Sequence, residues 1–276
     1  MRIELPIVEY DSAAHGWTPL TELVELVRYR DLVLIMVANM IKTRYKRSAL
    51  GVVWTLLNPL LNMVVLTIAF SSIFSNSLVH YPVYVLTGLV FWTFFSQTTL
   101  FAMNALVWGG GLLKRVYIPR TIFAVAAVGN GLVNLGLSLI PLVLIMVILG
   151  HPIYAAWWLM PLSVLLVAMF TLGVSLFMST LAVFFTDVVD IYAVLVQAVF
   201  FLTPIVYPKE IFPAGLAWLL NLNPMVTLLE VFRAPIYLGT MPDANTLLTA
   251  TVMAVAALLI GWWTFTRKAD EFAYRI

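Results

Sequence analysis

Two long stretches of the chain carry no charged side chain. Residues 48–113 and residues 121–186 each run for 66 residues without Asp, Glu, Lys or Arg. A helix needs about 20 consecutive apolar residues to cross the hydrocarbon core of a bilayer, so one crossing cannot account for either stretch. Each stretch therefore predicts two membrane-spanning helices joined by a short turn.

The composition agrees with a chain that lies mostly in lipid. Hydrophobic residues make up 63% and charged residues 10% of the 276 residues, whereas a soluble domain has roughly 45–50% and 25%. Because the chain has no cysteine, disulfide bonds and thiolate metal sites are excluded. We expect an all-α integral membrane protein with six transmembrane helices.

Turn residues and the lengths of the apolar runs give the bounds of the six spans. Polar and turn-forming residues at 75–82 and 150–152 divide each uncharged stretch in two. Two further apolar runs lie between Asp187 and the C-terminal tail. The predicted spans are residues 51–74, 82–107, 121–149, 155–185, 188–207 and 245–266. Residues 49–276 then form the transmembrane domain, and residues 1–48 form a cytoplasmic N-terminal segment.

The cations predict which side of the membrane each loop faces. With the N-terminus in the cytoplasm, all Lys and Arg residues except Lys209 and Arg233 lie on the cytoplasmic side. This bias is the positive-inside pattern, and it accounts for the net charge of +2 without a nucleic-acid partner. We expect a multi-pass protein of the cytoplasmic membrane with both termini in the cytoplasm.

The segment before the first span is predicted to form a helix on the inner membrane surface. Thr18 suits the cap and Pro19 the first turn of such a helix. Its uncharged part, residues 32–41, would be roughly 15 Å long as a helix, which is half a bilayer. An amphipathic interface helix is therefore expected rather than a seventh span, either as a plain membrane anchor or as a surface for a partner.

Residues 208–243 hold two apolar pieces that are too short to cross the membrane. Residues 221–224, with the sequence Asn-Leu-Asn-Pro, separate them. Because backbone groups cannot stay unpaired in hydrocarbon, we expect a re-entrant helical hairpin that packs against protein. A hairpin lying on the outer surface is the alternative. Glu230 and Arg233 are spaced i and i+3, so they are expected to pair on one helix face.

The connection between the second and third spans, residues 109–120, is basic and rich in glycine. Three glycines at 109–111 end one helix, and Pro119 opens the next. Lys114 and Arg115 lie in a short apolar piece between these breaks. The piece is either an ordinary basic turn or a short helix presented to a cytoplasmic partner.

The remaining ionisable residues do not predict a catalytic or metal site. His15, His80 and His151 fall in predicted tails or turns, where we expect solvated side chains. Asp187 and Asp190 fall in the first turn of the fifth span, where acids favour the positive end of the helix dipole.

Two other function classes fit this sequence pattern less well. An intramembrane prenyltransferase needs several carboxylates around Mg²⁺, and the spans offer one pair. An ion-driven secondary transporter needs ionisable side chains near the midplane, and the first four spans contain none. Both classes are disfavoured, and no metal site is expected.

Five segments occur in a characteristic order and spacing along nearly the whole chain. They are "RYRDLVLIMVANMIKTRYKRSALGVVWTLLNPL", "LLKRVYIPR", "TDVVDIYAVLVQAVFFLTPIVYP", "NLNPMVTLLEVFRAPI" and "TRKADEFAYRI". Together they resemble the permease subunit of bacterial ABC exporters for polysaccharides, the group that exports O-antigen, capsule and teichoic acid. The chain departs from that family at Thr186, where arginine is usual.

The resemblance implies an assembly and an activity. The permease would be a homodimer bound to two copies of a separate ATPase subunit, and it would move a lipid-linked glycan across the bacterial inner membrane. ATP and Mg²⁺ would bind to the ATPase, so this chain would need no cofactor and would not be an enzyme. A related ABC permease for a small molecule or drug is the alternative.

The resemblance also implies roles for particular residues. Those expected at the ATPase contact are Arg44, Tyr45, Lys46, Arg47, Leu113, Lys114, Arg115 and Tyr117. Those expected at an outer re-entrant gate are Asn221, Asn223, Pro224, Glu230 and Arg233. Sugar rings stack on aromatic faces, which suggests a substrate path along Trp54, Asn58, Tyr84, Phe91, Trp92, Phe95, Gln97, Phe200 and Phe201, with Asn62, Phe94 and Gln197 beside them.

Overall fold

The computed structural model describes residues 19–46, 51, 53–74, 78–108 and 119–275. Most of these residues are helical and none of them forms a strand, which confirms the predicted all-α class. The helices are α1 (Pro19–Arg28), α2 (Arg30–Tyr45), α3 (Val53–Phe74), α4 (Tyr81–Trp108), α6 (Thr121–Ile148), α7 (Met160–Phe184), α8 (Val188–Leu202), α9 (Ala217–Leu222), α10 (Pro224–Arg233) and α11 (Ala244–Arg275). Short turns of helix are η1 (Ala155–Leu159), η2 (Lys209–Ile211), η3 (Ala214–Leu216) and the π-helical η4 (Ala234–Leu238).

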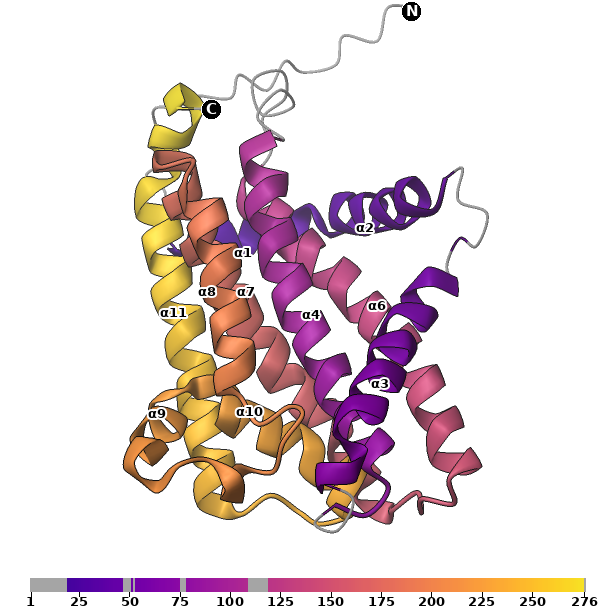
Figure 1. The fold of residues 1–276 in the computed structure, drawn as a ribbon. Coiled ribbons are helices and arrows are strands. Elements are labelled where there is room, and N and C mark those ends of the chain that lie inside the picture. Colours follow the sequence, from indigo (N-terminus) through magenta and orange to yellow (C-terminus); the bar gives the residue numbers. More distant parts are fainter. Residues whose placement is uncertain (1–18, 47–50, 52, 75–77, 109–118, 276) are drawn as a thin grey trace, which may run out of the picture.

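Five helical segments of the described chain are long and apolar enough to cross a membrane. They comprise α3, α4, α6, η1 with α7, and the first 26 residues of α11. Most residues in the apolar part of α4 and α7 are buried, whereas few residues in the apolar part of α3 and α11 are. Figure 1 shows α4 and α7 in the middle of the bundle, with α3 at one side and α11 at the other.

Helix α8 is apolar but shorter than the other five. The sequence predicts a span over residues 188–207, whereas α8 ends at Leu202 after 15 residues. A helix of that length measures about 22 Å. Pro204 has no backbone N–H and disfavours helical backbone at Thr203, which is extended. The chain therefore leaves the helix before it reaches the length of a full span.

Helices α7 and α11 approach each other closely at two glycines. A Cβ atom added at Gly261 would collide with the carbonyl oxygen of Gly173, and one added at Gly173 would collide with the backbone of Ala257. Small residues allow helix backbones in a membrane to come this near. The exposed helix α11 is thereby fixed against the buried helix α7.

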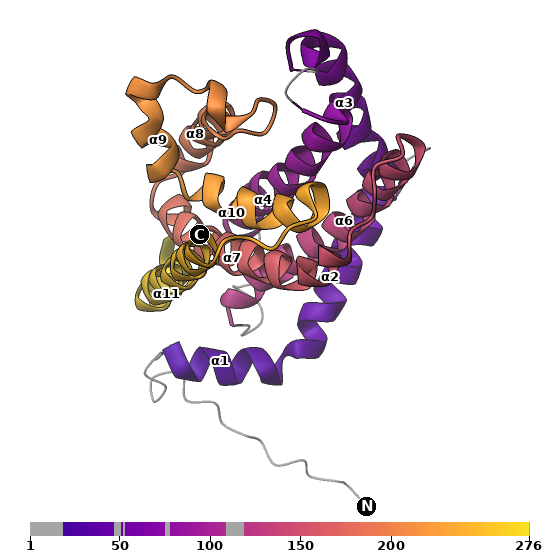
Figure 2. The same ribbon diagram turned by 90° about the horizontal axis from the view of Figure 1, so that it is seen from below.

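Helices α1 and α2 lie across the long helices rather than along them. Figures 1 and 2 show them near the end of the bundle where α11 finishes, while α9 and α10 lie at the opposite end. Helix α2 packs against α6, where Val37 lies beside Gly129. Leu34 and Ile35 of α2 are more than half exposed, and polar residues of the same helix such as Asp31 and Lys42 are exposed as well.

Candidate functional site

Arg233, at the end of α10, is the centre of a buried polar cluster near the end of the bundle that carries α9 and α10. Its side chain is 8% exposed. Nη1 donates to the carbonyl oxygen of Pro204 over 2.8 Å, and Nη2 donates to the carbonyl oxygens of Ile205 over 3.2 Å and Tyr84 over 3.4 Å. The guanidinium also lies 3.7 Å from the centre of the Tyr84 ring. Arg233 therefore donates to carbonyl groups of the segment that follows α8, and it ties this segment to α4.

The predicted pairing of Glu230 with Arg233 is wrong. Glu230 Oε1 accepts instead from Lys209 Nζ over 2.8 Å. This hydrogen bond raises the pKa of Lys209 above its usual 10.5. The i, i+3 spacing allows Arg233 as a partner of Glu230. Arg233 instead donates to buried carbonyl oxygens that follow α8, and Lys209 reaches Glu230 from an earlier segment of the chain.

The break between α9 and α10 is built as a helix cap. Asn223 Oδ1 accepts from the backbone N–H of Met225 over 3.0 Å, and Asn223 Nδ2 donates to Thr203 Oγ1 over 3.0 Å. Pro224 occupies the first turn, where its missing N–H costs nothing. Asn221 is exposed at the end of α9. Of the predicted gate residues, Asn223 and Arg233 thus contact the segment that follows α8.

Most aromatic residues predicted for the substrate path pack against one another. Tyr84, Phe91, Trp92 and Phe95 are each less than 9% exposed. Trp92 is the centre of a smaller cluster, with its ring centre 5.9 Å from that of Phe95 and 5.5 Å from that of Phe200, whereas Tyr84 packs on Tyr237 and Phe91 on Phe232. Phe200 is half-buried, and Phe201 beside it is largely exposed. Within one chain, then, only the α8 end of this cluster reaches the surface.

The other predicted path residues line a separate cavity of about 830 Å³ between α3, α4 and α6, with α2 at one end. We call it the polar cavity. Trp54, Asn58 and Gln97 line it, as does Phe94. Asn62 does not, but its Nδ2 donates to Asn58 Oδ1 over 2.8 Å. None of the described residues that line the cavity is charged.

The α6 side of the polar cavity was not predicted from the sequence. Asn130, Asn134 and Ser138 all line it. Their i, i+4, i+8 spacing places them on one face of a helix. Polar residues at this spacing within an uncharged run could have predicted a polar helix face. Gly131 on the same helix meets Thr98 of α4 so closely that a Cβ atom would collide with its Oγ1. This close approach forms one wall of the cavity.

The residues predicted to contact an ATPase fall mainly outside the described residues. Arg47, Leu113, Lys114, Arg115 and Tyr117 all lie there. Of the remaining three, Arg44 and Tyr45 belong to the last turn of α2, and Lys46 follows it with an exposed side chain.

His151 is not solvated, contrary to the sequence prediction. It is 6% exposed, because its ring packs against His80 with 5.2 Å between ring centres and also against Tyr154 and Tyr237. Burial lowers the pKa of His151. His80 is half-buried, and His15 lies outside the described residues. The turn before α4, the turn before η1 and η4 meet at this pair.

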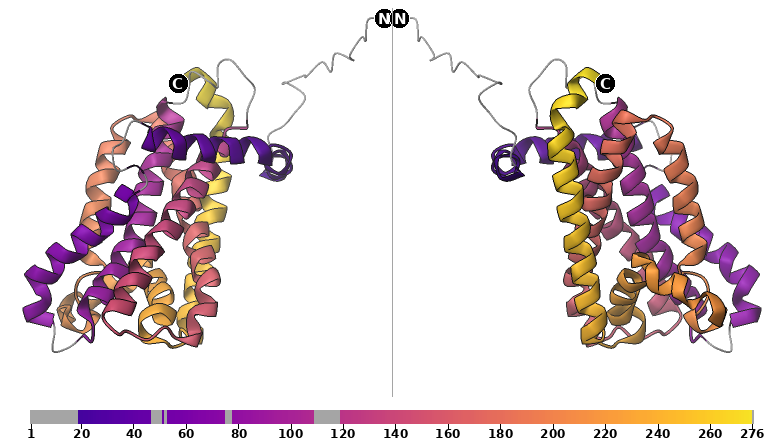
Figure 3. Two further views of the ribbon diagram at one scale, coloured as in Figure 1. Left: turned by 90° about the vertical axis from the view of Figure 1, so that its right-hand side faces the viewer. Right: turned by 90° about the vertical axis from the view of Figure 1, so that its left-hand side faces the viewer.

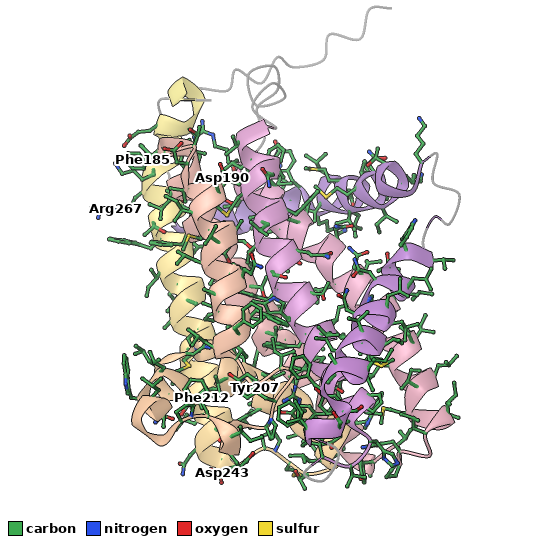
Figure 4. All side chains as sticks on the ribbon, viewed as in Figure 1. Phe185, Asp190, Tyr207, Phe212, Asp243 and Arg267 are labelled. Carbon is green, nitrogen blue, oxygen red and sulfur yellow. The ribbon has the colours of Figure 1, made fainter. Side chains whose placement is uncertain are left out.

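The acidic pair of α8 is exposed. Asp187 precedes the helix and makes no capping hydrogen bond, and Asp190 lies in the first turn. Among the described residues, no group of three or more His, Cys, Asp or Glu is placed to hold a metal ion. Figure 4 shows Asp190 at the same end of the bundle as Arg267, and Tyr207, Phe212 and Asp243 at the other.

These features define a class of protein. A bundle of long apolar helices, crossed by two helices at one end and closed by two short helices at the other, is an integral membrane protein (Figure 3). Its polar groups surround a cavity and a buried arginine. The chain belongs to the ABC-2 type transporter family, whose model matches residues 31–237.

Three named relatives are similar over most of the chain. The O-antigen export system permease protein RfbA of Myxococcus xanthus is 32% identical over 91% of this chain and 98% of its own length. A protein of the same name from Klebsiella pneumoniae is 26% identical over 76% of this chain and 82% of its own length. The polysialic acid transport protein KpsM of Escherichia coli is 23% identical over 80% of this chain and 87% of its own length.

Proposed function

We propose that this chain is the membrane-spanning permease subunit of an ABC exporter for a cell-surface polysaccharide. The observation that carries the proposal is the similarity to an O-antigen export permease over 98% of that protein's length. The polysialic acid transport protein supports the same substrate class, because both relatives are named for the movement of a sugar polymer rather than of a small molecule.

The topology we propose has six crossings, with α8 as the fifth, in the bacterial inner membrane. Because α8 is short, the segment from 203 to 207 and the Arg233 cluster would complete the crossing inside protein, which allows irregular backbone at membrane depth. Helices α9 and α10 would form the re-entrant hairpin on the outer side. The hairpin's second half, α10, is mostly buried, as a segment packed against protein should be. Helices α1 and α2 and both termini would face the cytoplasm, where the basic residues concentrate.

The assembly we propose contains two copies of this chain and two copies of an ATPase. Ile68 of α3 and Val194 of α8 are largely exposed apolar residues on helices at the surface of the bundle, so these helices are available for lipid or for a second permease. The end of α2 and the basic residues Lys114 and Arg115 would contact the ATPase. Nothing in this chain would need to be catalytic, since ATP and Mg²⁺ would bind to the partner.

Transport would follow from a difference in contacts. If the ATPase touches α2 and the 109–120 segment differently in its nucleotide-bound and nucleotide-free states, each state favours one arrangement of the helices. The Arg233 cluster joins the hairpin to α4 and to the end of α8. A shift of α4 would therefore reach the outer segment directly. The Trp92 cluster, exposed at Phe201, would offer aromatic faces on which sugar rings stack.

Deletion and complementation test the function. Removing the gene should leave the polysaccharide inside the cell, as measured by surface labelling of the glycan, and the wild-type gene should restore surface display. Lys114→Glu with Arg115→Glu should abolish display and lower the yield of ATPase that copurifies with the permease. Arg267→Glu with Lys268→Glu, at two exposed positions of α11, makes the same change of charge and should retain both. Normal surface glycan in the deletion strain would refute the proposal.

A further inference from the structure

The polar cavity is lined by neutral hydrogen-bonding groups and lies between helices that are long enough to span a membrane. Amide side chains from three helices line it, namely Asn58 of α3, Gln97 of α4, and Asn130 and Asn134 of α6. Alkyl chains of lipid cannot hydrogen-bond to amides, so a lipid tail in this space would leave them unsatisfied. The cavity therefore suits a polar occupant.

One of these side chains has an unpaired oxygen in the described part of the chain, and a second is exposed beside the cavity. Asn130 is 7% exposed, and its Oδ1 has no hydrogen bond. Gln97 lies near the middle of α4. Its side chain is exposed, although most neighbouring residues of the helix are buried. Buried polar groups in native proteins are normally paired. An unpaired amide beside a cavity therefore indicates a ligand group that the chain itself does not supply.

The lining selects the chemistry of that ligand. Because no described lining residue is charged, a phosphate or carboxylate would find no counter-ion among these residues. Aromatic rings of Trp54, Phe94 and Phe101 accompany the amides and hydroxyls. Apolar ring faces together with neutral donors and acceptors match a sugar, which has C–H faces for stacking and hydroxyls for hydrogen bonds.

The size and position of the cavity agree with a membrane-anchored sugar. A volume of about 830 Å³ lies within the roughly 300–1,000 Å³ of small-molecule sites. Met40 and Thr43 of α2 line one end, so the cavity extends to the level at which α2 crosses the bundle. The contact of Gly131 with Thr98 holds α4 and α6 together on one side, while α3 diverges from α4 toward α2 in Figure 1.

We propose that the polar cavity binds an uncharged sugar unit of a glycolipid, with Gln97 and Asn130 as hydrogen-bonding partners and Trp54 as a stacking face. The choice of a sugar rests in part on the proposed function. The ligand is either the exported lipid-linked glycan or a resident glycolipid of the membrane, since both carry the same chemistry.

Photolabelling of the full-length chain in lipid nanodiscs tests the site. The probe is an alkyl β-glucoside with a diazirine next to its headgroup, compared with the same alkyl chain bearing phosphocholine. The glucoside should label α3 and α6 beside Asn58 and Asn130. Gln97→Leu and Asn130→Leu should each lower this labelling about tenfold, as expected for loss of a hydrogen-bonding partner. Asn104→Leu, on α4 but outside the cavity, should leave it unchanged.

Competition identifies the source of the sugar. A glucosyl diacylglycerol that removes the label indicates a resident glycolipid, and a lipid-linked oligosaccharide that removes it indicates the exported substrate. Equal labelling by the phosphocholine probe, failure of both competitors, or labelling that Gln97→Leu does not change would overturn the inference and indicate a water-filled cavity. Because Gln97 is exposed, its replacement should not impair folding. Surface display of the glycan is scored separately, so loss of the sugar site and loss of the export function remain distinguishable.

Discussion

The guanidinium of Arg233 lies 3.7 Å from the centre of the Tyr84 ring, and its Nη2 donates to the Tyr84 carbonyl oxygen. The same side chain reaches the carbonyl oxygens of Pro204 and Ile205. One residue of α10 therefore holds together α4, the end of α8 and the outer segment. No carboxylate within 4.0 Å balances it in the described chain, so its charge is solvated by backbone oxygens and by an aromatic face.

Replacing Arg233 should weaken this junction. Arg233→Met should destabilise the protein by about 2–3 kcal/mol, because the buried carbonyl group of Ile205 loses its side-chain donor and that of Pro204 keeps only the Tyr84 hydroxyl. Arg233→Lys should recover only part of the loss, because an ammonium group cannot span carbonyls on two segments as the guanidinium fork does. Thermal unfolding of the detergent-solubilised chain measures both. Arg267→Met, which removes an exposed arginine lying over Trp263, is the control and should cost under about 0.5 kcal/mol.

The ion pair of Lys209 with Glu230 should contribute little to stability. Both side chains are substantially exposed, so a double-mutant cycle of Lys209→Met and Glu230→Gln should give a coupling of about 0.5 kcal/mol. The two single variants should have similar effects, because each removes one charge of the same ion pair. A cost for Glu230→Gln far above that for Lys209→Met would indicate a second partner for Glu230.

The same pair predicts a pH dependence at the alkaline end. The pKa of Lys209 is raised above 10.5 by its hydrogen bond to Glu230. The folded protein therefore binds this proton more tightly than the unfolded chain does, and the stabilisation is complete below pH 10.5. It is lost as the pH rises through the folded-state pKa. Unfolding midpoints between pH 9 and pH 11.5 should fall less in Lys209→Met than in the wild type.

His151 predicts a pH dependence at the acidic end. Burial lowers its pKa below the usual 6.5, and His80, Tyr154 and Tyr237 face it without a carboxylate among them. Below pH 6.5 the unfolded chain binds a proton that the folded protein binds less readily, so stability should decrease. His151→Gln should reduce this decrease between pH 7.5 and pH 5.5 in hydrogen-exchange rates of residues 149–154. Tyr154→Phe should retain the acid sensitivity of the wild type.

The two glycines between α7 and α11 should tolerate no side chain. Gly261→Ala should lower the unfolding midpoint, because its Cβ meets the backbone of Gly173, and overpacking costs about 1–3 kcal/mol. Gly136→Ala on α6 is the matched control. Its Cβ has open space, so the same substitution should be neutral or stabilising by up to about 1 kcal/mol. Equal effects of the two substitutions would contradict the close helix contact.

Several features followed directly from local sequence. Long uncharged runs predicted helices near residues 51–74, 82–107 and 121–149, and helices occupy Val53–Phe74, Tyr81–Trp108 and Thr121–Ile148. Asn-Pro at 223–224 predicted a helix break, and it forms the start of α10. These signals are local, because span length is set by bilayer thickness and a proline acts on its immediate neighbours.

Other features depended on segments far apart in the chain. Spacing along one helix suggested Arg233 as the partner of Glu230, but the partner is Lys209, which precedes it by 21 residues. His151 was expected in solvent and is buried by residues of two other segments. Aromatic residues expected along a path pack instead on one another, since composition does not specify which way a ring points.

The sequence by itself determined that this is a helical membrane protein and where its long helices lie, because transfer of apolar side chains into lipid depends on composition and length alone. Only the tertiary structure decided which polar groups meet. The partner of a buried arginine, the surroundings of a histidine and the amides around a cavity depend on how helices cross, and the approach of Gly131 to Thr98 illustrates how a single missing Cβ atom sets such a crossing.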